Sequence, residues 1–251
     1  MLVTLLGTGT STGVPEIGCH CAVCRSDNRK DKRLRASVMV VCEDEVILID
    51  CGPDFRQQML QHALPMPTAL LVTHHHYDHV GGMDDLRPAT RHKHVAVYAS
   101  HACADVLKQH YTYMFEEAKY PGVAQVKLQA MDLSPFYIGK NLIVPIEAYH
   151  YKLPVRGYRL GDFAYLTDFS HIDPRELQKL QGVRVLVIEA LRHKPHIAHV
   201  TLSEAMDLVE QINPEQVYFT HMSHDMGKHD EVNLTLPAGM ALGYDGLTFT
   251  V

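Results

Sequence analysis

The segment Thr73-His74-His75-His76-Tyr77-Asp78-His79 decides how this 251-residue sequence is interpreted. A strand rich in aliphatic residues, expected over residues 69–73, leads into it. Side chains alternate in an extended chain, so His74 and His76 point to the same side and can bind one ion. Asp78 and His79 follow where the chain must turn, so they can face a second ion beside the first. The segment therefore predicts a site for two metal ions.

Imidazole and carboxylate groups favour zinc, manganese or iron over calcium, which prefers oxygen ligands alone. The alternative is a surface histidine run that binds metal adventitiously. Two more expected strands also end in metal-capable side chains: residues 163–167 precede Asp168, and residues 217–220 precede His221. Loops at strand ends often carry function in α/β proteins. The three strand ends together predict one site.

The composition is that of a globular protein, with 46% hydrophobic residues and a net charge of -6. We expect one domain over residues 1–251, because this length is within the range of a single core. The negative charge argues against a general nucleic-acid binder, which normally carries a basic face. No run approaches the roughly 18 apolar residues of a membrane span, and the start lacks the features of a signal peptide. We therefore expect a cytoplasmic protein without disulfides.

Short strand-like and helix-like patterns alternate along the chain, which predicts an α/β fold. Strands are expected over residues 3–6, 36–42, 45–50, 159–160, 183–189 and 216–220. A hairpin is expected over residues 136–145 with its turn at 139–141, and Asp44 is placed in another hairpin turn. Helices are expected over residues 55–62, 101–111, 174–181 and 202–212. Asp173 is the expected N-cap of the third helix, and Thr201 or Ser203 of the fourth.

A second cluster, Cys19, Cys21 and Cys24, has Cys-x-Cys-x2-Cys spacing. Three thiolates so close together need a cation to offset their repulsion, and tetrahedral zinc commonly takes three cysteines and one histidine. The alternative is three chance thiols in a loop. The residues alone leave the fourth ligand open between His20 and several remote histidines. Cys42, Cys51 and Cys103 are unclustered and are expected to be small buried residues.

The metal-binding segment resembles the signature His-x-His-x-Asp-His of the metallo-β-lactamase superfamily. That resemblance implies an αβ/βα sandwich of two mixed β-sheets flanked by helices, with two divalent ions, Zn or Mn, at one rim. It also implies that His150 completes the first site, that Asp168 bridges both ions and that His221 completes the second. A hydroxide between ions about 3.5–4 Å apart would be the nucleophile, and Asp78 is a candidate for orienting it.

A branch of this superfamily is similar over nearly the whole chain. It opens with a turn like Gly7-Thr8-Gly9-Thr10-Ser11, continues with the triple-cysteine loop, and closes with a motif like Thr220-His221-Met222-Ser223-His224. These features resemble the phosphoribosyl cyclic phosphodiesterases of phosphonate breakdown. The resemblance implies that His224 is the fourth ligand of a structural zinc. It also implies a small cyclic phosphodiester as substrate, and a homodimer by analogy.

The segment Ala198-His199-Val200-Thr201 resembles one that places a histidine over the scissile phosphate in phosphodiesterase branches. His199 is thus the candidate general acid, a task suited to imidazole. The alternative is that His199 caps the following helix. Glu189 resembles a glutamate that partners this histidine in tRNA 3′-processing relatives, but this match does not decide between the branches.

Three other functions compete with a small-substrate phosphodiesterase. A tRNA 3′-end endonuclease normally needs an RNA-gripping arm, and no Gly/Pro- and Lys-rich insertion is visible. A thioester or lactone hydrolase would not explain the cysteine loop or the His199 segment. A zinc-stabilised, non-catalytic interaction domain would be expected to lack some ligands. Two minor expectations concern charge: the basic run over residues 28–35 is interpreted as a solvated loop, and Asp85 and Arg87 as a structural ion pair.

Overall fold

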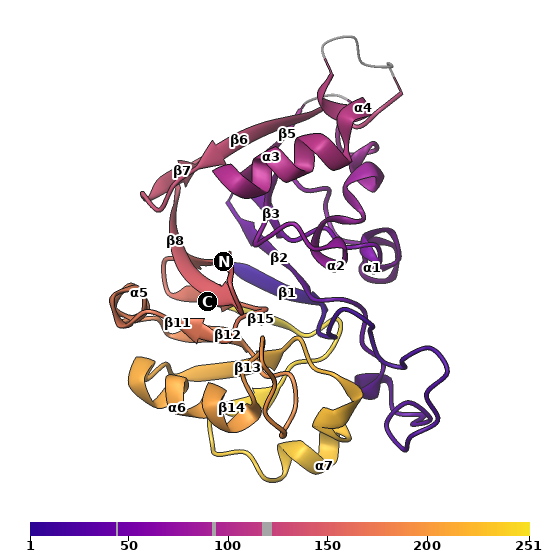
Figure 1. The fold of residues 1–251 in the computed structure, drawn as a ribbon, viewed down its shortest axis with the longest axis vertical. Helices are drawn as coiled ribbons and strands as arrows, with labels where there is room; N and C mark the ends of the chain where they lie inside the picture. Colours follow the sequence, from indigo (N-terminus) through magenta and orange to yellow (C-terminus); the bar gives the residue numbers. More distant parts are fainter. Residues whose placement is uncertain (44, 92–93, 117–121) are drawn as a thin grey trace.

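The computed structural model describes residues 1–43, 45–91, 94–116 and 122–251. Two β-sheets face each other, and helices cover the outer side of each (Figure 1). This is the αβ/βα sandwich that the sequence predicted. The expected hairpin turn at Asp44 lies outside the described residues.

The first sheet has the strand order β15-β1-β2-β3-β4-β5-β6. Its strands β3, β4, β5 and β6 run parallel, and β1 and β2 are antiparallel neighbours. The bounds are β1 Leu2–Gly7, β2 Ser37–Cys42, β3 Glu45–Ile49, β4 Ala69–Leu71, β5 Val95–Ser100, β6 Val126–Met131 and β15 Thr248–Thr250.

The second sheet has the order β11-β8-β9-β10-β12-β13-β14, with β7 also paired to β8. Strands β10, β12, β13 and β14 run parallel. The bounds are β7 Phe136–Ile138, β8 Asn141–His150, β9 Leu153–Leu160, β10 Phe163–Leu166, β11 His171–Ile172, β12 Val185–Glu189, β13 Gln216–Thr220 and β14 Met240–Leu242.

Helices α1 to α4 lie with the first sheet and α5 to α7 with the second (Figure 1). Their bounds are α1 Phe55–His62, α2 Tyr77–Val80, α3 His101–His110, α4 Thr112–Phe115, α5 Pro174–Gln178, α6 Leu202–Ile212 and α7 His229–Asn233. Three 3₁₀ helices are η1 Arg29–Asp31, η2 Met83–Leu86 and η3 His224–Met226. No described helix has the length and apolar character that a bilayer crossing needs.

Apolar side chains that alternate in direction along each strand fill the core on both sides of each sheet. Ile47 and Ile49 pack between the sheets, whereas Leu48 faces the helices of the first half. In β10, Phe163 and Tyr165 likewise face the first sheet, whereas Ala164 and Leu166 contact the layer that contains α6. Because side chains alternate with a period of two, one run of apolar residues supplies both layers. These strands are therefore buried on both faces.

Most of the expected elements are confirmed, and some boundaries are wrong. Helix α6 begins at Leu202 with Thr201 as N-cap in a capping box with Glu204, and Asp173 caps α5 as expected. Strands β8 and β9 are much longer than expected, because Pro145 and Pro154 interrupt the strand pattern in the sequence. Pro145 lies between the stretches of β8 that pair with β7 and β11, where only β9 pairs with it. A proline is tolerated at such a position.

The basic run over residues 28–35 is not simply a solvated loop. Arg33 is only 4% exposed, and its Nη1 donates to Thr8 Oγ1 at 2.8 Å and to the Gly243 carbonyl at 2.7 Å. The expectation of an Asp85–Arg87 pair is also wrong, because Arg87 Nε donates to Asp84 at 3.0 Å. Asp84 lies three residues before Arg87, a spacing that places the two on one face of the helical turn.

The parallel strands place several loops at one edge of the sandwich. Asp50 directly follows β3 and His221 directly follows β13, whereas one residue separates Asp168 from the end of β10. All three have positive φ angles: 62° at Asp50, 57° at Asp168 and 57° at His221. Such a backbone is uncommon for residues other than glycine and tends to occur at functional sites. The chain termini meet elsewhere, where the Met1 ammonium donates to the Val251 carbonyl at 2.7 Å.

Candidate metal centre

The predicted metal-binding segment changes from extended to helical within six residues. His74 follows β4 and is 1% exposed, and His76 has an extended backbone as the N-cap of α2. The rings of His74 and His76 lie 4.5 Å apart between centroids, and both offer a nitrogen close to Asp168. The structure thus brings together the first predicted group of ligands.

The second group consists of Asp78, His79, Asp168 and His221. Asp78 and His79 lie in the first turn of α2, which turns them away from the direction of the extended segment. His79 Nε2 is 3.1 Å from Asp78 Oδ2 and 3.2 Å from Asp168 Oδ2. His221 Nε2 is 3.7 Å from the same oxygen of Asp168.

Asp168 is common to both groups. Its Oδ2 lies 3.1 Å from His74 Nε2 on one side and 3.2 Å from His79 Nε2 on the other. This is the position that a bridging carboxylate would occupy. The left-handed backbone at Asp168 turns the chain directly after β10, so that the carboxylate faces the other loops.

His150 lies beside the first group but outside the tightest clusters of donor atoms among the described residues. Its ring centroid is 5.2 Å from that of His76. Its Nδ1 lies 3.0 Å from the Ala198 carbonyl and 3.0 Å from Asp168 Oδ1. A hydrogen bond from Nδ1 to the carbonyl leaves Nε2 as the nitrogen available to an ion.

The donor atoms fit metal ions better than they fit one another. Among the described residues, His74 Nε2, His79 Nε2, His221 Nε2 and Asp168 Oδ1 are buried without a hydrogen-bond partner. Buried polar atoms are normally satisfied, so their convergence indicates a bound cation.

Burial lowers the pKa of His74 to about 3, which leaves it neutral and able to bind metal. Burial alone would also lower the pKa of His221, but the negative charge of Asp168 and the nearby carboxylates of Asp78 and Glu189 raise it to about 10. A divalent ion would displace that proton, as metal binding at histidine does generally.

Glu189 and His199 form a pair at the edge of this cluster. His199 Nδ1 lies 2.5 Å from Glu189 Oε1, and Glu189 is completely buried at the end of β12. Burial alone would lower the pKa of His199, but the charge of Glu189 raises it to about 9. The alternative that His199 caps α6 is wrong, because Thr201 is the N-cap. The Glu189 carboxylate thus favours the protonated form of His199, beside the two predicted ligand groups.

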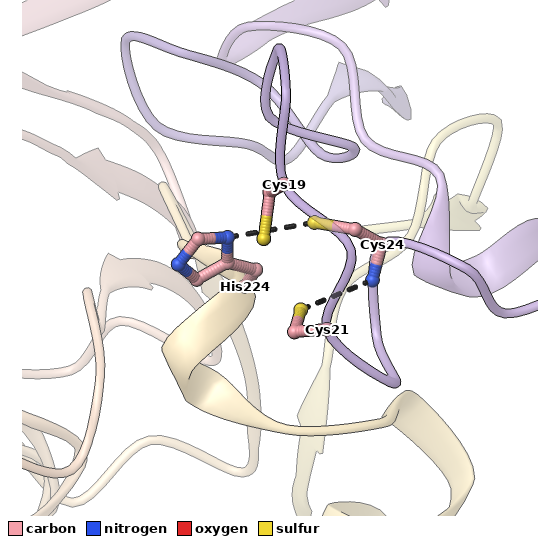
Figure 2. A group of neighbouring side chains, drawn as sticks. All are labelled: Cys19, Cys21, Cys24 and His224. Carbon is pink, nitrogen blue, oxygen red and sulfur yellow. Dashed lines mark hydrogen bonds between the residues drawn. The ribbon is translucent and has the colours of Figure 1, made fainter.

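The cysteine cluster lies on a loop that contacts the C-terminal part of the chain. Cys19, Cys21, Cys24 and His224 each offer one donor atom, all within 4.8 Å of one another (Figure 2). Cys24 Sγ is 3.4 Å from His224 Nδ1, and the Cys24 N–H donates to Cys21 Sγ at 3.4 Å. Zinc–sulfur bonds of about 2.3 Å and zinc–nitrogen bonds of about 2.0–2.1 Å require this spacing. The donor set therefore fits a tetrahedral zinc.

Comparison with known proteins gives the family. The model of the β-lactamase superfamily domain matches residues 45–222. A crystal structure titled as a new diphosphatase from the PhnP family is 40% identical, with a TM-score of 0.93, and the match covers 100% of this chain and 97% of that one. The chain belongs to the PhnP branch of the metallo-β-lactamase superfamily. This membership agrees with the metal-dependent hydrolase that the sequence predicted.

Other relatives of this PhnP-branch chain give less information about its function. An octanoyltransferase of Porphyromonas gingivalis is 44% identical over 251 residues, covering 98% of this chain. The chain spans about half of that relative's length, 51%. Human tRNase Z, short form, has a TM-score of 0.72 at 18% identity and covers 100% of this chain and 99% of that one. At that identity the likeness shows only the fold.

One supporting residue of the PhnP-branch site was missed in the sequence. Asp50 is completely buried after β3, and its Oδ2 accepts the His79 Nδ1 proton at 2.6 Å. It also accepts the Thr73 N–H and hydroxyl, both at 2.8 Å. A carboxylate that orients a ligating histidine is common at metal sites. The signal was present, because Asp50 also ends a predicted strand.

Proposed function

We propose that the chain hydrolyses a small phosphodiester at a pair of divalent ions. Zn or Mn would be held by His74, His76, Asp78, His79, His150, Asp168 and His221, with a structural Zn held by Cys19, Cys21, Cys24 and His224. The observation that carries the proposal is the sharing of Asp168 Oδ2 between two groups of ligands. The buried Glu189 and the partly buried His199 form a pair beside them.

When bound, two divalent ions supply a water molecule of lowered pKa as nucleophile and neutralise charge on the phosphoryl oxygens. The chain's own residues would position the ions, the water and the leaving group. Asp168 would fix the separation of the two ligand groups, and Asp78 would orient the attacking water.

His199 holds its Nδ1 proton against Glu189, so Nε2 is the nitrogen that can protonate the leaving oxygen. A positioned general acid of this kind contributes about 10²- to 10⁴-fold to the rate.

A diphosphate is the second candidate, because a relative 40% identical to this chain is described as a diphosphatase. A phosphodiester and a diphosphate ester both present a phosphoryl group with two substituents, so the same metal pair can serve either. The name of the P. gingivalis relative makes an octanoyl thioester a useful further comparison. That relative has about as much sequence outside the match as inside it, which weakens this third candidate.

The test is a substrate panel on fully metallated protein, with metal content measured on the same sample. We expect about three ions per chain, from the two-metal pair and the structural zinc. The panel contains bis(p-nitrophenyl) phosphate, ribose 1,2-cyclic phosphate, 2′,3′-cyclic nucleotides, a nucleoside diphosphate ester, precursor tRNA and an octanoyl thioester. Hydrolysis of the small diesters or the diphosphate supports the proposal. Absence of both activities in a metallated sample contradicts it.

The role of His199 is tested with two leaving groups. His199→Ala should slow hydrolysis of the ribose cyclic phosphate by about 10²-fold or more, because the departing alkoxide needs a proton. The same variant should affect bis(p-nitrophenyl) phosphate much less, because p-nitrophenolate leaves without protonation. His101→Ala is the matched control, since His101 is an exposed histidine at the start of α3. Equal losses on both substrates would contradict the general-acid role.

A further inference from the structure

The loop between β12 and α6, residues 190–201, brings a second imidazole next to His199. The ring of His196 lies 4.8 Å from that of His199 between centroids, at an interplanar angle of 43°. His199 in turn lies 5.3 Å from His221. The three rings form a row that begins at a predicted metal ligand and ends at His196, which is exposed.

The loop that carries His196 is held by hydrogen bonds within the loop and to the neighbouring chain. The Leu191 N–H donates to the Val200 carbonyl at 3.0 Å, which closes the base of the loop. The Arg192 guanidinium donates to the carbonyls of Lys194 and Pro195, both at 3.1 Å. His193 Nε2 lies 2.9 Å from the Met226 carbonyl. The exposed ring of His196 is therefore held on a fixed support.

One nitrogen of His196 has a structural partner and the other does not. The Ala198 N–H donates to His196 Nδ1 at 3.2 Å, so the ring proton is assigned to Nε2. No hydrogen bond from Nε2 is found to any residue that the structure describes. His196 thus presents one N–H donor on a ring whose centroid lies 4.8 Å from that of His199.

A purely structural role does not require histidine at this position. Asparagine, aspartate and serine side chains readily accept the N–H two residues further on, which is the bond that His196 makes to Ala198. Such a side chain would give the loop the same turn. What histidine adds is the Nε2–H group, on a ring that lies 4.8 Å from that of His199 between centroids. Two rings at this spacing could both donate to one phosphoryl group.

We propose that His196 is a substrate-binding residue whose Nε2–H donates to a non-bridging phosphoryl oxygen of the substrate. The inference rests on the proposed function and deepens it. Two imidazole donors on one loop favour a substrate with negatively charged non-bridging oxygens. A carboxylic thioester or lactone has no such oxygen, so His196 would select phosphoryl substrates over acyl substrates.

The test compares His196→Phe, which keeps a flat ring without the donor, with His196→Gln, which restores an N–H at similar reach. Ile197→Ala is the matched control, because Ile197 is the next residue in the loop and is 73% exposed. The probe is inorganic phosphate, measured by calorimetry on metal-loaded protein and as an inhibitor of cyclic phosphate hydrolysis. Metal content is measured for every variant.

A hydrogen bond to a charged group corresponds to about a tenfold or greater change in affinity. We expect His196→Phe to weaken phosphate binding and raise KM by about tenfold, with kcat changed much less. His196→Gln should recover most of the loss, and Ile197→Ala should bind phosphate like the wild type. Wild-type phosphate affinity in His196→Phe would overturn the inference. So would equal losses in the Phe and Gln variants, which would indicate a structural role.

The calorimetric measurement separates this inference from the proposed function. If none of the phosphoryl substrates is hydrolysed, yet phosphate binding depends on the His196 donor, the proposed function fails and the subsite stands. If the substrates are hydrolysed and phosphate binding does not depend on that donor, the inference fails and the proposed function stands.

Discussion

Replacing Asp50 with asparagine changes one atom of a fully buried carboxylate that touches no ion in the proposed site. In the wild type, Oδ2 accepts protons from both the Thr73 hydroxyl at 2.8 Å and His79 Nδ1 at 2.6 Å. In Asp50→Asn, Oδ1 can still accept the Thr73 N–H, but an NH₂ group would then face His79. Two donors would point at each other, unless the His79 proton moves to Nε2, the nitrogen that faces Asp78 and Asp168.

The expected loss of metal affinity follows from the number and kind of these hydrogen bonds. A hydrogen bond to a charged group contributes about 1.5–3 kcal/mol, and every 1.4 kcal/mol or so corresponds to tenfold in affinity. Loss of the His79 bond should therefore weaken the second ion by about 10- to 100-fold, in agreement with the usual effect of such supporting residues. The affinity for the first ion, held by His74 and His76, should fall much less.

The assay is competition for zinc against a chromophoric chelator, which resolves the tight and weak sites of each variant. Asp31→Asn is the matched control, because Asp31 is 1% exposed and accepts bonds from the His229 N–H and the Ser26 hydroxyl. It should lower thermal stability without changing affinity for the catalytic pair. If Asp50→Asn leaves both affinities unchanged, or weakens both equally, the assignment of Asp50 to His79 is wrong.

Two further predictions separate the two metal sites and the acid. Cys21→Ser should reduce zinc content by about one ion and lower the melting temperature, by about 2–4 °C for each kcal/mol of stability lost. His76→Ala, in contrast, should chiefly abolish turnover. Unchanged zinc content and melting temperature in Cys21→Ser would contradict the structural zinc site. Because the pKa of His199 is raised to about 9, kcat on the cyclic phosphate should persist below that pH and fall above it. In Glu189→Gln, without the charge that raises this pKa, the fall should move to lower pH; identical pH–kcat profiles would contradict the pairing.

The sequence predicted best where a local pattern determines local structure. The spacing of His74, His76, Asp78 and His79 required only an extended segment followed by a turn, and α2 provides that turn. Helices α1 and α6 match the expected ranges, and the start of α6 carries a local signal, the capping box at Thr201. Strands that end in metal-capable residues were also recognised as belonging to one edge.

What the sequence did not predict depends on distant contacts. Strand β9 was reduced to two residues, because Pro154 and Gly157 interrupt its pattern. Strand β6 was missed because polar residues alternate with its apolar ones, whereas β5 was missed although its pattern is typical of a strand. Arg33 was interpreted as solvated, since its burial depends on Thr8 and Gly243. The position of Asp50 at the end of a predicted strand was a signal, but its particular role depends on contacts to Thr73 and His79 that form when β3 lies beside β4.

The meeting of the two chain ends matters for how this fold can be combined with others. Strand β1 runs from Leu2 to Gly7, and the Met222 N–H donates to the carbonyl of the next residue, Thr8, so the far end of β1 lies by the His221 loop. A strand of this length spans about 20 Å, which separates the junction of Met1 and Val251 from that edge. A second module joined at either end would emerge from one point and leave the histidine cluster open. A short linker between the ends should likewise permit circular permutation.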